Sequence, residues 1–353
     1  MFIVLLCVLV SGTDPNYISP LWLTTYANWH HKNRLNTQVP QLIYHCDTSF
    51  VCGGIGDRFK GIISSFYAAV HLQRLFFVYM PTPVSLESIF NTSEINWRIP
   101  SDRPNCTKMI SQLNVVPQWL QHFDSTSDPW GKTKVVCVRL NTLGAFFDRL
   151  TLNFTTASYT NNAMGAFASA AFRTLFRPQK RVEDAVQQIQ QSASLPTLGT
   201  CFRCQTPFWL GVHIRTDDTA FRTNVVNSRA SSMIGNIALC IRNIVDFTGN
   251  ISVYVASDSY AVKQRLMSDL PFIKTTELKP THYDQQQNDH VSTWAELLVL
   301  ANAPCLLAAK RSGYSNLASW LRESFGDTTP RCFIVGPNLH SKCNANALKQ
   351  LIV

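Results

Sequence analysis

The chain has 353 residues, of which 46% are hydrophobic and 15% are charged, a composition typical of an ordered globular protein and not of a fibrous or low-complexity chain. Its formal net charge of +9 suits an anionic ligand, but lysine and arginine are scattered without a basic block or interleaved aromatic residues, which argues against nucleic acid. A single core usually stops growing near ~250 residues, so we expect two lobes.

The N-terminus is apolar from Phe2 to Val10, a run too short to span a bilayer, which takes ~20 residues. The small residues Ser11 and Gly12 follow it, so residues 1–12 are interpreted as a signal peptide. No positively charged region precedes the run. A membrane-anchoring segment with residues missing upstream is therefore the alternative.

Cysteines and glycosylation sequons point to the secretory pathway, in the ER or Golgi lumen or outside the cell. Of eleven cysteines, ten follow Cys7, enough for five disulfides whose pairing the sequence does not define. Cys201-Phe-Arg-Cys204 resembles half of a zinc site, but no second pair has metal-ligand spacing, so we expect no metal. The sequons are Asn91-Thr-Ser, Asn105-Cys-Thr, Asn153-Phe-Thr and Asn250-Ile-Ser.

The first half predicts a strand–helix–strand unit. An apolar strand over 41–46 leads through a glycine-rich turn at 52–57 into a helix capped by Asp57, and a second strand covers 75–80. Such a unit has parallel strands and a right-handed crossover, and ligands bind at the carboxyl ends of its strands. The apolar helix positions are Phe59, Ile62, Ile63, Phe66 and Val70.

The second half repeats the alternation of strands and helices. A helical segment over 166–191 precedes the looser run 192–199, which we interpret as the junction between lobes at 40–195 and 200–345. Residues 98–134, rich in Pro, Ser and Asp, are interpreted as loops. The expected strands are 209–215, 251–257, 305–309 and 332–336, and the expected helices are 233–245, 260–267, 292–302 and 316–324.

The most informative segment is Gly211-Val-His-Ile-Arg-Thr-Asp-Asp218, where an apolar strand delivers a histidine and an arginine to its end. The planar guanidinium of Arg215 can grip two phosphate oxygens at once, which a lysine cannot do with the same geometry. An arginine at a strand end is also a common structural ion-pair partner. The functional interpretation therefore depends on other motifs.

Three further segments of the second half lie close to the ends of predicted strands. They are residues 253–259, 294–296 and 310–316. Together with Gly53-Gly-Ile-Gly-Asp-Arg58 and His213-Ile-Arg215, they resemble the fucosyltransferase superfamily with a His-x-Arg strand, which includes core alpha-1,6-, alpha-1,2- and protein O-fucosyltransferases. The resemblance runs from about Tyr44 to Trp320.

That resemblance implies a GT-B architecture, an α/β fold of two Rossmann-like lobes whose parallel sheets face a central cleft. GDP-fucose would bind the second lobe and a glycan or glycoprotein acceptor the first, with inverting transfer and no metal. The sequence has no Asp-x-Asp motif of the kind that clasps a metal-bound diphosphate.

By the same resemblance, Arg215 would hold the GDP phosphates and stabilise the leaving group, with His213 beside them. Asp258 would accept hydrogen bonds from the guanine, although it could instead cap the helix that follows. Ser312 and Ser315 would contact phosphates near a helix N-terminus, although either could be only a helix cap.

Glu296 corresponds to an acidic position on a helix that lines the nucleotide site, whereas an exposed helical glutamate is usually only solvated.

In the first lobe, Gly53, Gly54 and Gly56 would let a ligand approach the backbone, and Asp57 and Arg58 would reach the sugar or acceptor. A tight turn before a capped helix is the simpler alternative for that loop.

Relatives commonly have His-x-Arg-x-Gly-Asp, whereas here Asp217 precedes Asp218 and adds negative charge near the expected phosphates. Asp218 is counted among the donor-binding residues. The general base is not assigned, with Asp57 and Asp218 as candidates.

Two alternative functions remain open. One is a secreted carbohydrate-binding pseudoenzyme of the same fold, and the other is a GT-B enzyme that uses another nucleotide sugar.

Overall fold

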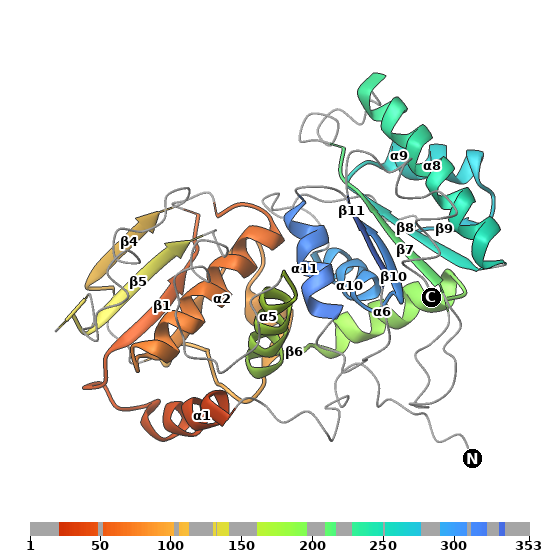
Figure 1. Ribbon diagram of the computed structural model, residues 1–353. Coiled ribbons are helices and arrows are strands. Elements are labelled where there is room, and N and C mark those ends of the chain that lie inside the picture. The colour runs from red at the N-terminus through yellow and green to blue at the C-terminus, as the bar shows by residue number, and fades with distance from the viewer. Residues whose placement is uncertain are drawn as a thin grey trace, which may run out of the picture. The chain divides into compact units, whose positions relative to one another are not determined.

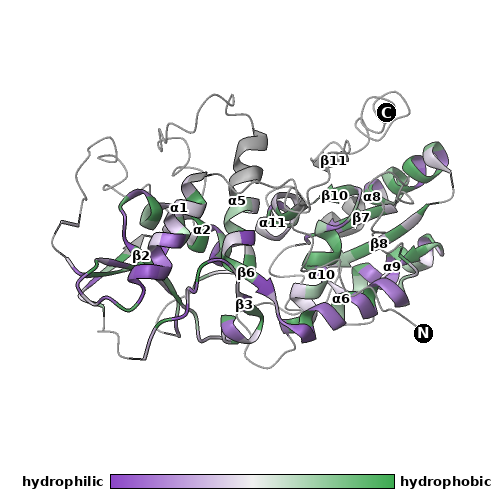
Figure 2. Cartoon of the chain, turned by 90° about the horizontal axis from the view of Figure 1, so that it is seen from below, coloured by the Kyte–Doolittle hydropathy of each residue, from purple (hydrophilic) through white to green (hydrophobic). Residues whose placement is uncertain are grey.

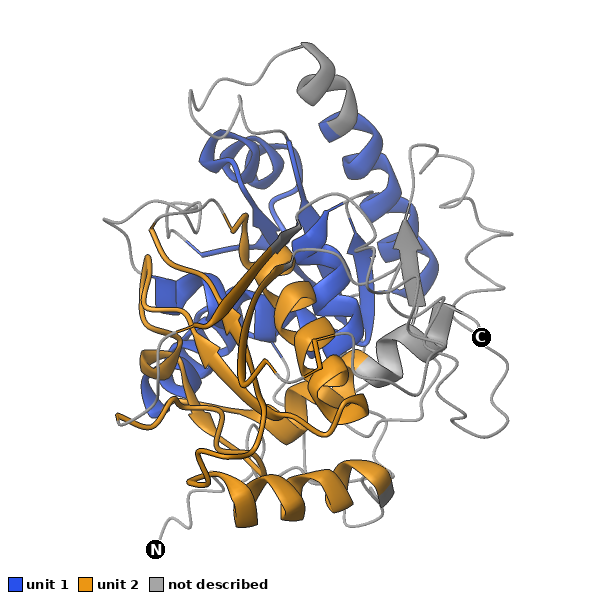
Figure 3. Cartoon of the chain, turned by 90° about the vertical axis from the view of Figure 1, so that its left-hand side faces the viewer, with its two compact units in different colours: residues 1–12, 180–282, 287–353 blue, residues 13–179, 283–286 orange. Residues whose placement is uncertain are grey.

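The chain forms two compact units in the computed structural model: unit 2 comprises residues 13–179 and 283–286, and unit 1 comprises 1–12, 180–282 and 287–353 (Figure 3). The division falls after Gln179, whereas the sequence predicted a junction at 192–199. Helix α6 (Lys180–Ser192) packs against α10 (His290–Ala301), which is why it belongs to unit 1. The structure describes residues 21–48, 52–101, 106–112, 130–131, 133–140, 161–195, 209–216, 228–249, 251–276, 290–308, 312–322 and 332–335.

Unit 2 is built on a four-stranded parallel sheet in the order β2-β1-β5-β4. The strands are β1 (Gln41–His45), β2 (Leu75–Tyr79), β4 (Lys108–Gln112) and β5 (Val135–Leu140). The expected parallel pairing of β1 with β2 is confirmed. The interpretation of 98–134 as loops is wrong at β4, because this polar edge strand pairs with the apolar β5.

Helix α2 (Ile55–His71) follows the glycine loop and contacts β1, β2 and β5. Its expected apolar positions are buried, except that Val70 is half-buried. The expectation that Asp57 caps the helix is wrong, because the helix begins earlier with Gly54 at the N-cap. Asp57 lies in the first turn, where its negative charge complements the helix dipole.

Further elements of unit 2 were not predicted. Helix α1 (Leu21–Asn33) packs its buried Tyr26 and His30 rings against Phe66 and Phe77. The predicted helical segment 166–191 is interrupted, because helix α5 (Asn161–Leu175) ends where β6 (Phe176–Pro178) pairs with β3 (Phe90–Thr92) as an antiparallel ribbon. A 3-10 helix, η1 (Leu86–Ser88), precedes β3.

Unit 1 contains a five-stranded parallel sheet in the order β11-β10-β7-β8-β9. The four strands predicted from the sequence are present with ends shifted by one residue at most, and the two-residue strand β9 was not predicted. Figure 2 shows β8 mostly in green, the colour of hydrophobic residues. The strands are β7 (Trp209–Ile214), β8 (Ser252–Ser257), β9 (Ile273–Lys274), β10 (Cys305–Ala308) and β11 (Cys332–Val335).

Helices cover both faces of this sheet (Figure 1). One face, with Val212 and Val253, packs against α8 (Ser228–Thr248) and α9 (Tyr260–Asp269). On the other, a Cβ added to Gly211 would lie 2.8 Å from Ala303 Cβ, just beyond α10, so only glycine permits this close packing. Helix α11 (Gly313–Arg322) contacts β10 and α10.

The expected α/β class with parallel sheets is confirmed for both units. None of the helices in the described ranges combines the length and the hydropathy needed to cross a membrane. The apolar segment 2–10, on which the signal-peptide and anchor interpretations depend, lies outside these ranges.

Candidate functional site

The end of β7 carries His213 on the face that packs against α10 and α11. The imidazole is buried, its Nδ1 lies 2.6 Å from Ser315 Oγ, and its ring centroid lies 4.9 Å from that of Tyr314. Burial, followed by the charges of Arg215 and Lys263, lowers the pKa of His213 from 6.5 to about 3. The side chain is therefore neutral at physiological pH and held in one orientation.

Arg215 directly follows β7 and forms an ion pair with Asp258, which directly follows the neighbouring strand β8. The parallel register aligns Ile214 with Ser257, and this alignment brings the two side chains together. Arg215 Nη1 lies 3.2 Å from Asp258 Oδ2, and the arginine is the more exposed partner.

Asp258 is also bound to the residue after Arg215. Its Oδ1 accepts hydrogen bonds from the Thr216 backbone N–H and hydroxyl, both at 2.9 Å. Burial raises the pKa of Asp258, and the Thr216 hydrogen bonds and the Arg215 charge oppose that rise. The carboxylate thus holds the segment that carries Arg215, and its predicted contact with guanine stays a prediction.

The alternative that Asp258 caps the next helix is wrong, because Ser259 occupies the N-cap of α9. The Ser259 side chain accepts a hydrogen bond from Val262 N–H. Asp258 instead accepts hydrogen bonds from Thr216, which follows the neighbouring strand β7.

Ser312 and Ser315 lie at the start of α11, next to the β7 edge. Ser312 Oγ accepts a hydrogen bond from Ser315 N–H at 3.3 Å, as a capping side chain does. Ser315 is fully buried, and its hydroxyl bonds to His213. The two serines couple the N-terminus of α11 to the His-x-Arg strand, and their contact with phosphate stays a prediction.

Glu296 is buried on α10, so the alternative of a merely solvated glutamate is wrong. Its Oε1 lies 2.9 Å from Lys263 Nζ, and it accepts hydrogen bonds from the Thr276 and Tyr254 hydroxyls at 2.7 and 3.1 Å. Burial and the Glu296 charge raise the pKa of Tyr254. This buried polar network joins α9 and α10 to β8, the strand that ends next to Asp258.

In unit 2, the glycine loop is organised by Arg58, which is buried. Its guanidinium donates to the carbonyls of Gly53 and Thr82 at 2.9 and 3.0 Å and to Cys46 Sγ at 2.7 Å. Gly53 has a φ of +75°, and an added Cβ would lie 2.8 Å from Asp57 Oδ2. Arg58 therefore holds the loop in place, which is a role the sequence did not predict.

Asp57 is the exposed member of this loop and pairs with Lys60 at 2.9 Å. Gly54 is the N-cap of α2 and Gly56 lies in its first turn, so the tight turn before a helix is present. Ligand contacts of these glycines stay predictions. Asp217 and Asp218 lie outside the described residues.

Four side chains at the carboxyl edge of the unit 2 sheet escaped the sequence analysis: His45, Asp47, Tyr79 and Arg139. His45 Nε2 lies 2.8 Å from Asp47 Oδ2, and Arg139 Nη2 lies 3.3 Å from Asp47 Oδ1. The available signal was that β1 ends in His45, β2 ends in Tyr79, and Arg139 is the penultimate residue of β5. The apolar run of β5 had to be recognised first.

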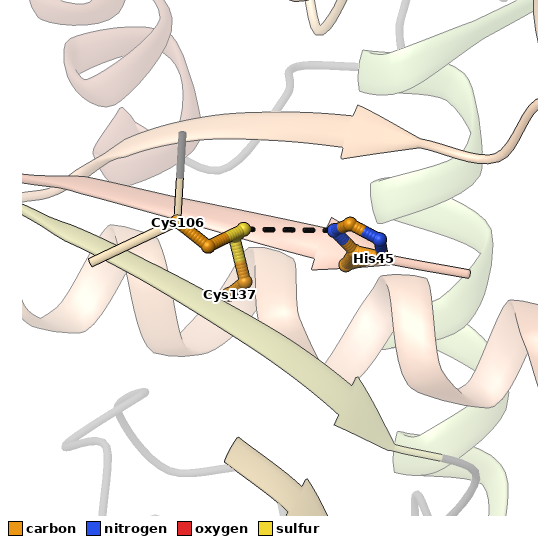
Figure 4. Close-up of side chains that lie close together, drawn as sticks. All are labelled: His45, Cys106 and Cys137. Carbon is orange, nitrogen blue, oxygen red and sulfur yellow. Dashed lines mark hydrogen bonds between the residues drawn. A yellow bond between two sulfur atoms is a disulfide. The ribbon is translucent and has the colours of Figure 1, made fainter. Parts of the chain in front are cut away.

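Beside this edge, His45, Cys106 and Cys137 place their ligand atoms within 4.8 Å of one another (Figure 4). The two sulfurs form a disulfide and offer no thiolate to a metal in this oxidised form. A second disulfide joins Cys46 to Cys52 and closes the loop after β1, and Cys240 and Cys305 are also disulfide-bonded. The described part of the chain thus contains oxidised cysteines in both units.

No family model and no curated protein matches this chain. Its structure is similar to Arabidopsis thaliana FUT1 in complex with GDP, with a TM-score of 0.57 and 14% identity over 87% of this chain and 78% of that one. The fucosyltransferase NodZ from Bradyrhizobium gives 0.52 and 10%, over 80% and 93%. POFUT1 in complex with GDP-fucose gives 0.50 and 12%, over 86% and 98%. The chain therefore has a GT-B fold like that of solved fucosyltransferases.

Proposed function

We propose that this protein is a glycosyltransferase that moves fucose from GDP-fucose to a glycan or glycoprotein acceptor. The observation that carries the proposal is the arrangement at the carboxyl edge of the unit 1 sheet. There the partly exposed Arg215 is held by a buried carboxylate, beside a neutral His213 and the N-terminus of α11. The fold is shared with proteins crystallised with GDP or GDP-fucose.

Arg215 supplies the positive charge that the donor needs. In the transfer, the bond from the sugar C1 to the diphosphate oxygen breaks while the acceptor oxygen bonds to C1, and negative charge develops on the departing diphosphate. A fixed guanidinium stabilises that charge without reorganising, which is the effect that usually dominates such catalysis. Because Asp258 and Thr216 hold its segment, Arg215 is preorganised.

His213 supplies a neutral hydrogen bond in this proposal. When the Ser315 hydroxyl donates to Nδ1, the ring proton resides on Nε2 and can be donated to a phosphate oxygen. The low pKa keeps a second positive charge away from Arg215. The α11 N-terminus adds backbone N–H groups that favour an anion.

The finer features of the reaction are also proposals. Direct attack on C1 inverts the sugar configuration, and Arg215 takes the part that a divalent cation plays in other glycosyltransferases. The two disulfides of unit 2, the disulfide-bonded Cys240 and Cys305 of unit 1 and the exposed Asn91 of a sequon support a location in the secretory pathway. The acceptor proton passes to a base that Asp57 or Asp218 would provide.

The test is titration calorimetry of the secreted, deglycosylated chain with GDP and GDP-fucose in EDTA, comparing wild type with Arg215→Ala. We expect wild type to bind both nucleotides and the variant to lose them. The matched control is Arg265→Ala, which removes an exposed arginine of α9 that pairs only with Asp269 among the contacts described. It should bind GDP like wild type.

Other outcomes separate the alternatives. If wild type binds no GDP or GDP-fucose in EDTA, the proposed function is wrong, and glycan binding without a nucleotide would favour the pseudoenzyme. If UDP-sugars bind in place of GDP-fucose, the enzyme uses another donor. Full GDP affinity in Arg215→Ala would contradict the role of Arg215.

A further inference from the structure

A row of polar and aromatic side chains crosses the carboxyl edge of the unit 2 sheet. The parallel register pairs His45 of β1 with Tyr79 of β2, and Arg139 of β5 follows Val138, the partner of Tyr44. Because aligned residues of parallel strands point to the same face, Tyr79, His45 and Arg139 form one layer. The layer below them on that face is the apolar core with Ile43 and Phe77.

Asp47, two residues beyond His45, connects this layer. Its Oδ2 accepts from His45 Nε2 at 2.8 Å and its Oδ1 accepts from Arg139 Nη2 at 3.3 Å. On its other side, His45 Nδ1 lies 3.6 Å from Cys106 Sγ of the disulfide (Figure 4). The imidazole is thus fixed between a disulfide and a carboxylate. We call His45, Asp47, Tyr79 and Arg139 the edge cluster.

The edge cluster presents a carboxylate and an aromatic ring to solvent. The Asp47 side chain is 27% exposed and that of Arg139 only 13%, so the anion is the outer partner of the pair. Tyr79 is 41% exposed, and its ring centroid lies 4.7 Å from that of His45. The cluster therefore offers hydrogen-bond acceptors beside an apolar face.

That combination matches a neutral sugar. A pyranose has hydroxyl groups that donate to a carboxylate and an apolar face of C–H bonds that packs on an aromatic ring, and binding sites commonly pair an apolar surface with a few fixed polar groups. A phosphate or carboxylate ligand would meet the outward Asp47 first. The location, at the carboxyl ends of parallel strands, is where open α/β sheets bind ligands.

We propose that the edge cluster is a binding site for a neutral pyranoside, the acceptor sugar. Tyr79 packs against the sugar face, Asp47 accepts hydrogen bonds from its hydroxyls, and His45 and Arg139 position the carboxylate. The role as acceptor site rests on the proposed function. The sugar binding itself does not.

The experiment is saturation-transfer NMR on the full chain with its disulfides intact. The probes are methyl β-D-galactopyranoside, methyl N-acetyl-β-D-glucosaminide, methyl β-D-xylopyranoside and methyl α-D-mannopyranoside, each with and without GDP. We expect at least one glycoside to bind wild type, and Asp47→Asn and Tyr79→Ala to weaken it at least about ten-fold. Tyr79→Phe keeps the ring and should change the affinity by less than about two-fold.

A matched control is Leu35→Ala, which truncates an exposed apolar residue of the same unit outside the cluster and should bind like wild type. The proposal is overturned if none of the glycosides binds wild type under either condition. It is equally overturned if the affinity survives in both Asp47→Asn and Tyr79→Ala. Calorimetry with GDP on the same samples keeps the two proposals apart, because glycoside binding without GDP binding would support the sugar site and contradict the proposed function.

Discussion

Each of the two parallel sheets ends in an arginine–aspartate pair, and the two pairs face solvent in opposite ways. In unit 1, Arg215 is 34% exposed and Asp258 7%, with 3.2 Å between Nη1 and Oδ2. In unit 2, Asp47 is 27% exposed and Arg139 13%, with 3.3 Å between Oδ1 and Nη2. Unit 1 therefore presents the cation, and unit 2 presents the anion.

The difference shows how one strand geometry can present either charge to solvent. In both sheets the register of neighbouring parallel strands brings the two side chains together, and the buried member fixes the exposed one. An outward guanidinium suits the two phosphates of a nucleotide, and an outward carboxylate beside Tyr79 suits sugar hydroxyls. In the two proposals, the ligand that each edge favours depends on which member of its pair lies inside.

The largest expected effect comes from the buried network below the unit 1 edge. Lys263→Met would leave the Glu296 carboxylate buried without its cation, and we expect the free energy of unfolding to fall by about 3–5 kcal/mol in urea titrations. The control on the same helix is Arg265→Ala, whose exposed pair with Asp269 should cost less than about 1 kcal/mol. Similar losses in the two variants would contradict a supporting role for the buried pair.

The second test concerns the geometry of the exposed cation. Arg215→Lys keeps the charge but loses the planar fork, and we expect kcat/KM for GDP-fucose turnover to fall about 100-fold, equal to about 2.7 kcal/mol. Arg265→Lys makes the same exchange at an exposed site and should leave turnover unchanged. Equal activity of Arg215→Lys and wild type would mean that only charge matters at this edge.

The third test uses pH and His213. Its folded pKa of about 3 lies below the ordinary 6.5, so the folded state disfavours protonation. The stabilisation is fully present above pH 6.5 and is lost as pH falls from 6.5 towards 3. From this group alone, the free energy of unfolding should fall by about 1.6 kcal/mol between pH 6.5 and 5, because the unfolded histidine is half-protonated at pH 6.5 and the slope then approaches 1.36 kcal/mol per pH unit.

The matched variant for this measurement is His213→Gln, which cannot be protonated. Urea titrations across the same pH range should show a smaller fall for the variant than for wild type. Parallel pH profiles of the two proteins would show that the histidine is not held neutral by the fold.

The test with the smallest expected effect distinguishes two roles of Asp258, positioning Arg215 and binding the guanine. Asp258→Asn keeps an oxygen for Thr216 but removes the charge paired with Arg215, and we expect GDP affinity to fall about ten-fold. If Asp258 acts by positioning Arg215, pyrophosphate affinity should fall by the same factor. If GDP weakens and pyrophosphate does not, Asp258 reads the guanine as the resemblance implied.

Much of the fold was predictable because its strongest signals are local. The apolar runs that became β1, β2, β7 and β8 are bounded by turns and are buried on both faces, so their positions follow from the sequence alone. The polar edge strand β4 was not predicted, because its pairing with β5 is a long-range property. The boundary after Gln179 also depends on a long-range contact, that of α6 with α10.

The candidate site divides in the same way. His213 and Arg215 were found because they end a strongly apolar strand, whereas the burial of Glu296 depends on Lys263 and Thr276 from other elements. The sequence indicated Asp258, and not Ser259, as a possible cap of the helix that follows. The contact of Asp258 with Thr216 across the sheet leaves the cap to Ser259.

The sequence by itself determined the alternation of strands and helices, the parallel class of the sheets and the presence of an arginine at a strand end, because these follow from hydrophobic periodicity and turn residues within short segments. Only the tertiary structure decided which partner of each arginine–aspartate pair faces outwards. That depends on the register between strands and on the burial that packed helices impose, which join residues far apart in the chain.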